Sequence, residues 1–122
     1  GSWCRAKRKR TSASQYSLYV IDLDKDVLKN RRFMSENSHY DPTDNKPCVY
    51  VGHTAKTPDA RYLQHKEGGQ KSSSIVERFG LRLIPRDYES DNPLRGDRAN
   101  AIKKERELAK KLKQLGYAVW QK

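Results

Sequence analysis

Residues 16–23 read YSLYVIDL and form a near-continuous apolar and aromatic run. A strand with one buried face alternates apolar and polar residues, whereas a strand covered on both faces does not. We therefore expect residues 16–23 to form a strand in the interior of a sheet. Asp24, Lys25 and Asp26 follow this run and end it.

Turn residues and helix caps divide the rest of the chain into further elements. Residues 25–46 are polar and irregular, and a short helix over 27–34 is one interpretation of them. Gly52 is expected to stop the second strand, and residues 117–120 form either a last strand or a packed tail. Caps, prolines and apolar spacing predict strands at 48–51 and 81–84 and helices at 58–66, 75–79 and 98–115.

This order of two strands, two helices, a strand and a helix predicts an α+β domain with a small, mainly antiparallel three-stranded sheet flanked by helices. The chain has 122 residues, enough for one domain. We assign residues 15–122 to it, with 25–46 as an insertion between its first two strands. Residues 1–14 are expected to form a flexible basic arm that starts with Gly1-Ser2, a tag remnant.

The chain carries 26 Lys and Arg against 15 Asp and Glu, a formal charge of +11. Such a surplus attracts polyanions at long range, and nucleic acid is the commonest of them. A ribosomal or membrane-surface role would give the same charge, although we expect no membrane partner. No stretch approaches the roughly 18 apolar residues of a membrane-spanning helix, so a transmembrane span is not expected. Cys4 and Cys48 are too few for a disulfide framework. We therefore expect a reducing, intracellular compartment, cytoplasmic or nuclear.

Glu105 is a candidate for chemistry because of its place on the longest helix. It lies three residues before Leu108 and seven before Leu112, and so falls on the apolar stripe. A carboxylate on the buried side costs free energy unless it is paired or binds a metal. Two interpretations follow, a functional carboxylate or an ion pair with Arg98 or another nearby base.

Two pairs of side chains upstream are further candidates. Arg61 and His65 are four residues apart and share one face of their helix. Arg holds phosphate groups bidentately and His transfers protons near neutral pH, although a solvated helix face carries the same residues. Tyr19 and Tyr50 lie in the first two strands. If these strands pair, both phenols lie on one sheet face, where packing in the core is the simpler role.

These residues together resemble the GIY-YIG nuclease superfamily. The first family triplet appears as Ser17-Leu18-Tyr19, and the second as Tyr50-Val51-Gly52. Arg61 follows nine residues after Gly52, and His65 four residues later. The Glu105 helix is similar to the family's glutamate helix, and the resemblance spans roughly residues 16–116.

The resemblance implies a metal-dependent endonuclease that hydrolyses phosphodiester bonds of DNA at a single-metal site. Glu105 would ligate one Mg²⁺ or Mn²⁺. Tyr19 would orient or deprotonate the attacking water with support from Tyr50. Arg61 would clamp the scissile phosphate, and His65 would act as a second base or as a donor to the phosphate. DNA is then the expected partner, and no small-molecule cofactor is expected.

The same helix supplies candidates for nucleic-acid binding. Its basic residues lie mostly off the apolar stripe, where they track a phosphate backbone or simply solvate the surface. With Arg61, these candidates are Lys103, Lys104, Arg106 and Lys110. His39 and His53 are expected in a loop and a turn and receive no role.

The chain also departs from the family pattern. Ser17 and Leu18 replace Gly and Ile of the first triplet, and residues 25–46 stand where family members have a short hairpin. These departures favour an alternative, a non-catalytic nucleic-acid-binding module on the same scaffold. A third interpretation is a protein-interaction domain whose charge keeps it in solution.

Overall fold

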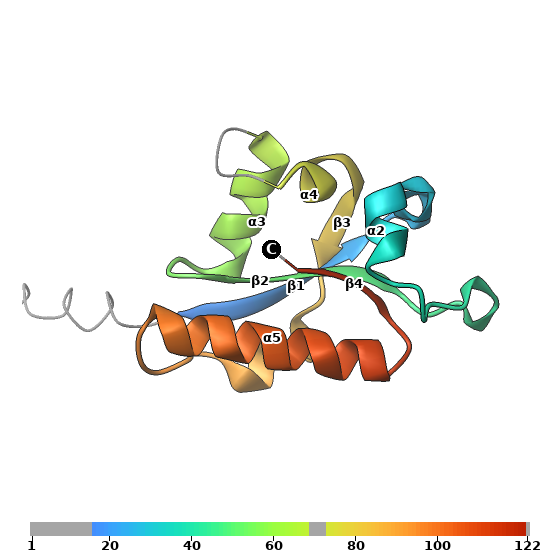
Figure 1. Ribbon diagram of the computed structural model, residues 1–122. Helices are drawn as coiled ribbons and strands as arrows, with labels where there is room; N and C mark the ends of the chain where they lie inside the picture. The colour runs from blue at the N-terminus through green and yellow to red at the C-terminus, as the bar shows by residue number, and fades with distance from the viewer. Residues whose placement is uncertain (1–15, 69–72, 122) are drawn as a thin grey trace, which may run out of the picture.

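The computed structural model describes residues 16–68 and 73–121 as an α+β fold (Figure 1). The predicted class is confirmed. The strands are β1 (Ser17–Leu23), β2 (Cys48–Thr54), β3 (Gly80–Leu83) and β4 (Ala118–Gln121). The α-helices are α2 (Arg31–Ser35), α3 (Pro58–Glu67), α4 (Ser74–Phe79) and α5 (Arg98–Gln114). Four short 3-10 helices complete it, η1 (Lys25–Lys29), η2 (Pro42–Asp44), η3 (Pro85–Asp87) and η4 (Glu89–Asp91).

The sheet is mixed and four-stranded, with the order β3-β1-β2-β4. β1 pairs antiparallel with both β2 and β3, and so lies in the interior of the sheet as predicted. β4 pairs parallel with β2. The prediction of three mainly antiparallel strands is therefore wrong. The open edge of β2 presents unpaired backbone groups, and the short apolar segment after α5 satisfies them while burying Ala118 and Val119.

Helices cover both faces of the sheet (Figure 1). α5 packs on one face against β1, β2 and β4, and α3 and α4 pack on the other against β1 and β3. The caps are those that the sequence predicts. Thr57 accepts a hydrogen bond from the backbone of Ala60, and Asp97 accepts one from Asn100. These caps fix where α3 and α5 begin, and with them the phase of each helix over the sheet.

The insertion between β1 and β2 folds against the edge of β4. Asn30 is extended and caps α2 by accepting the backbone N–H of Phe33, so η1 and α2 replace the single helix expected over 27–34. Asn37 is fully buried. Its side chain donates to the carbonyls of Phe33 (2.8 Å) and Val119 (2.9 Å) and accepts from Val119 N–H (2.7 Å). These bonds complete the outer edge of β4.

The expected basic arm, residues 1–14, and Cys4 lie outside the described residues. Within 16–68 and 73–121, the free cysteine is Cys48, which is buried. Of the helices in this part of the chain, none is long and apolar enough to cross a membrane.

We predict that Asn37→Ala lowers the free energy of unfolding by about 1–3 kcal/mol, because buried backbone groups of Phe33 and Val119 lose their partners. Urea denaturation followed by circular dichroism measures this change. Ser38→Ala, at the exposed neighbouring position, is the control and should change stability by less than about 0.5 kcal/mol. Equal midpoints for Asn37→Ala and the wild type would show that the insertion is not anchored as described.

Candidate active site

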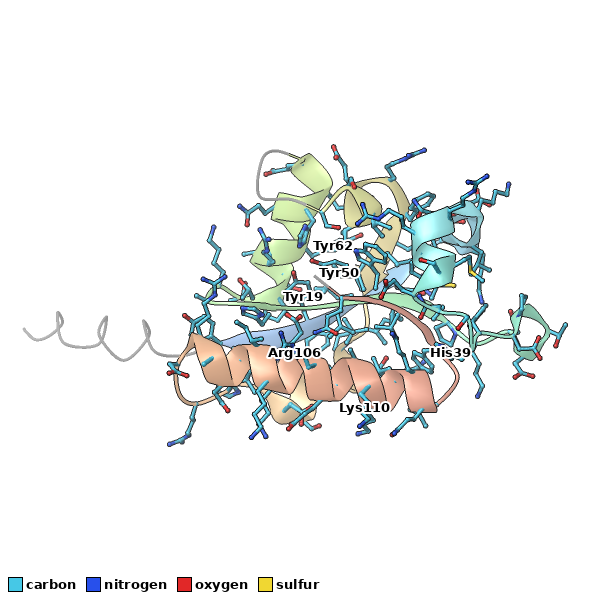
Figure 2. All side chains as sticks on the ribbon, viewed as in Figure 1. Tyr19, His39, Tyr50, Tyr62, Arg106 and Lys110 are labelled. Atoms are coloured by element: carbon cyan, nitrogen blue, oxygen red, sulfur yellow. The ribbon has the colours of Figure 1, made fainter. Side chains whose placement is uncertain are left out.

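A cavity of about 250 Å³ brings together four of the five predicted catalytic residues. We call it the Tyr19 cavity. Its lining includes Tyr19 of β1, Tyr50 of β2, Arg61 of α3 and Glu105 of α5. Figure 2 shows the two tyrosines between α3 and α5. The fifth residue, His65, contacts the cavity through Tyr19. Groups separated by most of the chain therefore converge here.

The cavity forms where β4 ends along the edge of β2. β4 pairs with residues 48–51 of β2, and the described chain offers no strand partner for Gly52–Thr54 on that side. Neighbouring residues of a strand point to opposite faces of the sheet. At such an uncovered edge, side chains from both faces can therefore line one cavity. Tyr50 points to the α3 side, and His53 points to the α5 side, where it contacts Glu105.

The two phenols lie on one sheet face, as expected for paired strands. Tyr19 is opposite Gly52 in the register, Tyr50 is opposite Ile21, and the phenol ring centroids are 6.0 Å apart. The Tyr19 ring crosses directly over Gly52. A Cβ atom on Gly52 would lie 2.5 Å from Tyr19 Oη. The expectation that Gly52 stops β2 is wrong, because this glycine lies inside the strand and makes room for the phenol.

The hydrogen bonds of His65 fix its tautomer. This buried ring accepts the backbone N–H of Ser73 at Nδ1, over 2.9 Å. A backbone N–H only donates, so the neutral ring carries its proton on Nε2. Nε2 lies 2.9 Å from Tyr19 Oη and therefore donates to it. In this arrangement His65 holds the phenol oxygen in place and does not accept its proton.

Burial moves the pKa of both phenols further above neutral pH than that of an ordinary tyrosine. It raises the pKa of Tyr19 above the usual value, although the charge of Arg61 and hydrogen bonds from Arg61 and Tyr50 oppose the shift. Burial also raises the pKa of Tyr50, and the neighbouring Tyr19 adds to the shift. Tyr19 Oη is thus surrounded by donors, which favour the phenolate, in an environment that disfavours any charge.

Glu105 is 3% exposed and both of its carboxylate oxygens accept hydrogen bonds. His53 Nδ1 lies 2.7 Å from Oε1, and Gln121 Nε2 lies 3.0 Å from Oε2. The sequence places Glu105 correctly on the buried stripe but identifies neither partner. His53 is in β2 and not in a turn. Continuing the period-two alternation of β2 past Gly52 would have found it, whereas Gln121 gives no sequence signal.

The predicted nucleic-acid-binding residues of α5 lie on different sides of the helix. Arg106 lines the Tyr19 cavity, together with Arg98, which the sequence offers only as an ion-pair partner of Glu105. Lys103 and Lys110 are exposed. The 100° step of a helix puts both roughly opposite Glu105, and Figure 2 places Lys110 on the side of α5 away from the tyrosines. They do not join the cavity.

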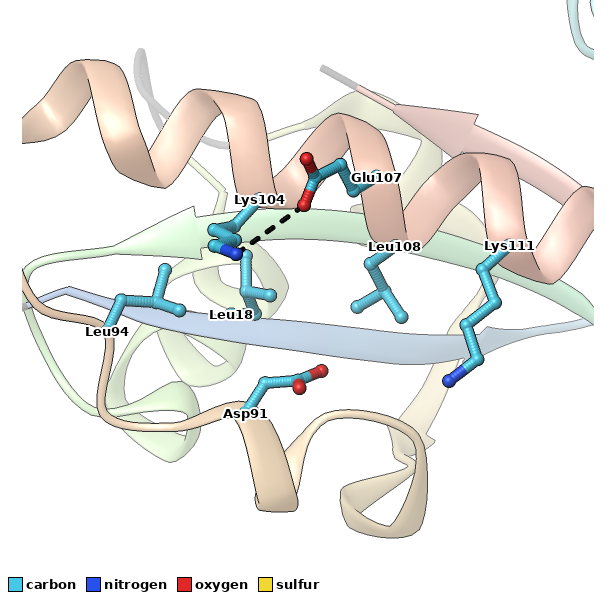
Figure 3. Close-up of a pocket in the computed structure, with 7 residues that line it drawn as sticks. All are labelled: Leu18, Asp91, Leu94, Lys104, Glu107, Leu108 and Lys111. Carbon is cyan, nitrogen blue, oxygen red and sulfur yellow. Dashed lines mark ion pairs between the residues drawn. The ribbon is translucent and has the colours of Figure 1, made fainter.

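Lys104 lines a second hollow, of about 260 Å³, on the other side of α5 (Figure 3). Its ammonium lies 3.6 Å from the carboxylate of Glu107. Leu18, Leu94 and Leu108 also line this hollow. It contains none of the predicted catalytic residues, so Lys104 is separated from the Tyr19 cavity by the body of the helix. His39 forms a hydrogen bond with the backbone carbonyl of Tyr117 and does not line the Tyr19 cavity.

The cavity offers a metal ion one carboxylate. Among the described residues, no group of three or more His, Cys, Asp and Glu is placed to hold a metal. A carboxylate oxygen that accepts one hydrogen bond retains a second lone pair for a cation. A hard ion such as Mg²⁺ is commonly held by one or two carboxylates, with water and substrate phosphate completing its shell. Glu105 fits this mode of binding and does not fit a closed protein cage.

Comparisons of the chain with models of protein families, with curated proteins and with solved structures found no significant match.

The raised pKa of Tyr50 predicts a loss of stability at high pH. The unfolded state releases this proton near pH 10, whereas the folded state retains it, so stability is complete below about pH 10 and falls above it. Between about pH 9 and 11, Tyr50→Phe should lose about 1.4 kcal/mol less free energy of unfolding than the wild type. Urea titrations at each pH give this difference. Parallel losses in both proteins would contradict a buried, protonated Tyr50.

Proposed function

We propose that this protein is a metal-dependent endonuclease of GIY-YIG type that hydrolyses phosphodiester bonds of DNA. The observation that supports this most directly is the convergence of Tyr19, Tyr50, Arg61 and Glu105 on one cavity. Their order along the chain is that of the family motifs. A buried carboxylate beside three arginines suits a reaction in which negative charge builds up on a phosphate.

Glu105 is the residue that would hold the ion, Mg²⁺ or Mn²⁺. Such an ion supplies Lewis-acid stabilisation of charge on the phosphate and the leaving oxygen. His53 and Gln121 orient the Glu105 carboxylate from opposite oxygens. A carboxylate held in this way loses little rotamer freedom when it binds a cation, which is the usual benefit of partners around a metal ligand.

The arginines provide the phosphate-binding side of the cavity. Arg61 and Arg98 come from different helices, and Arg106 follows Glu105 directly on α5. Arg61 Nη1 donates to Gln64 Oε1 over 2.7 Å, which holds part of its guanidinium on the α3 surface. Guanidinium groups form paired hydrogen bonds with phosphate oxygens and remain charged at every accessible pH. They would position the scissile phosphate beside Glu105 and Tyr19.

Tyr19 would orient the attacking water. Its oxygen accepts from His65 Nε2 and from the Tyr50 hydroxyl, so its own hydrogen is directed elsewhere. Because the pKa of Tyr19 is raised, the phenol begins the reaction protonated. Only added positive charge in the cavity lowers its pKa enough for it to accept a proton. The donors around its oxygen then stabilise the phenolate that forms.

A non-catalytic nucleic-acid-binding module is the second candidate. Two observations favour it: both oxygens of Glu105 already have hydrogen-bond donors, and burial raises the pKa of both tyrosines, which makes either phenolate harder to form. Such a module would keep the arginines as phosphate contacts and use Glu105 to tie β2, β4 and α5 together. Its binding to DNA would weaken steeply with salt, without cleavage.

Plasmid nicking with Mg²⁺ or Mn²⁺ separates the two candidates. We predict that the wild type nicks supercoiled DNA, that chelation stops it, and that Glu105→Gln lowers the rate by a factor of about 100 or more. The matched control is Glu107→Gln, an exposed carboxylate on the same helix, which should retain the wild-type rate.

Circular dichroism of each variant establishes that it is folded. Equal nicking by Glu105→Gln and the wild type would refute the site. A wild type that binds DNA in a salt-dependent way but never cleaves it would favour the binding module.

A further inference from the structure

A basic groove adjoins the Tyr19 cavity. It has a volume of about 500 Å³ and lies between α2, β4 and the second half of α5. Arg106 and Gln121 line both the cavity and this groove, so the two hollows meet at these residues. We call it the Trp120 groove, because the indole of Trp120 is the large aromatic surface among its lining residues.

Trp120 is partly exposed and its ring is held in a defined orientation. The buried Phe33 stacks against the indole, with ring centroids 6.2 Å apart and an interplanar angle of 22°. The guanidinium of Arg32 lies 6.0 Å from the indole centroid. Asn37 anchors this arrangement by bonding to Val119, the residue before Trp120. The indole is therefore packed against Phe33 and Arg32 in a defined orientation.

The groove is lined mainly by positively charged side chains, as expected of a site that binds a polyanion. Arg32, Arg106 and Lys113 line it against one acidic residue, Glu36. The Lys113 ammonium donates to the backbone carbonyl of Glu36 over 3.2 Å, so it lies across the groove between α5 and α2. Basic side chains that follow a backbone, together with an aromatic surface, are the elements by which proteins bind single-stranded nucleic acid.

We propose that the Trp120 groove binds a single-stranded segment of DNA next to the bond being cut, with one base stacked on Trp120. The proposal rests on the proposed function, and it specifies the substrate as DNA with a single-stranded stretch beside a duplex. In a continuous duplex the faces of the bases are covered by their neighbours, so an aromatic platform has nothing to stack against. The base takes the place of the Arg32 guanidinium, which now lies over the indole ring, and Arg32 then contacts phosphate together with Arg106 and Lys113.

This assignment also gives the insertion a role. Arg32 and Glu36, which form one wall of the groove, and Phe33, which supports the indole, belong to residues 25–46. These residues stand where the short hairpin of the family is expected. The insertion therefore builds a substrate-binding wall onto the edge of the sheet.

The test measures binding in EDTA, so that no cleavage occurs. Fluorescence anisotropy compares a blunt duplex with a duplex of the same length that carries a single-stranded flap. The wild type should prefer the flap. Trp120→Ala should weaken flap binding by about 5-fold or more, since stacking of one base contributes about 1–3 kcal/mol, and should leave blunt-duplex binding nearly unchanged. Trp120→Phe keeps an aromatic ring and should retain most of the preference.

A second readout needs no substitution at the groove. Trp3 and Trp120 are the two tryptophans of the chain, so in Trp3→Phe the emission comes from Trp120 alone. The flap should quench this emission, and the blunt duplex should not.

The proposal is overturned if Trp120→Ala weakens both DNAs equally, if it leaves flap binding unchanged, or if the flap fails to quench Trp120. A failure of plasmid nicking is a separate result. It would refute the proposed nuclease activity, whereas selective flap binding at Trp120 is tested by the anisotropy and fluorescence measurements.

Discussion

The close approach of Tyr19 to Gly52 is the contact on which the site depends. The phenol lies across the backbone of the neighbouring strand at a distance that leaves no room for a Cβ atom. This contact holds the Tyr19 oxygen near Tyr50 and within 2.9 Å of His65 on α3. Any side chain at position 52 would displace the phenol, and with it the oxygen around which the donors are arranged. The antiparallel pairing of β1 and β2 is thus a structural and a chemical requirement at once.

The two sides of the cavity differ in their electrostatic environment. On the α3 side, burial raises the pKa of two phenols despite the charge of Arg61. On the α5 side, a buried carboxylate is stabilised by donors from β2 and β4. A cation bound by Glu105 would act on both sides of the cavity. Its positive charge would offset that of the carboxylate and would favour the phenolate of Tyr19. This coupling is the physical reason for proposing a metal-dependent reaction.

Local sequence signals predict the elements well and their assembly less well. The apolar run of β1, the caps at Thr57 and Asp97, and the inward position of Glu105 follow from residue type and periodicity. The fourth strand follows only in part: residues 117–120 are expected as a last strand or a packed tail, because so short a segment cannot be decided without knowing that β2 has an open edge. His53 is missed because the second strand is expected to stop at Gly52, and Gln121 is missed because it gives no sequence signal. Their contacts with Glu105 join distant segments, and a single sequence carries no direct record of such contacts.

A crystal grown with Mn²⁺ and a DNA duplex bearing a single-stranded flap tests the central claim most directly. Anomalous scattering locates the manganese independently of the protein density. We expect one ion at a coordination distance of about 2.1 Å from the Glu105 carboxylate, with a DNA phosphate between it and Arg61. An ion bound elsewhere, with Glu105 still held only by His53 and Gln121 and the DNA lying on another face, would contradict the assignment of this cavity as a nuclease site.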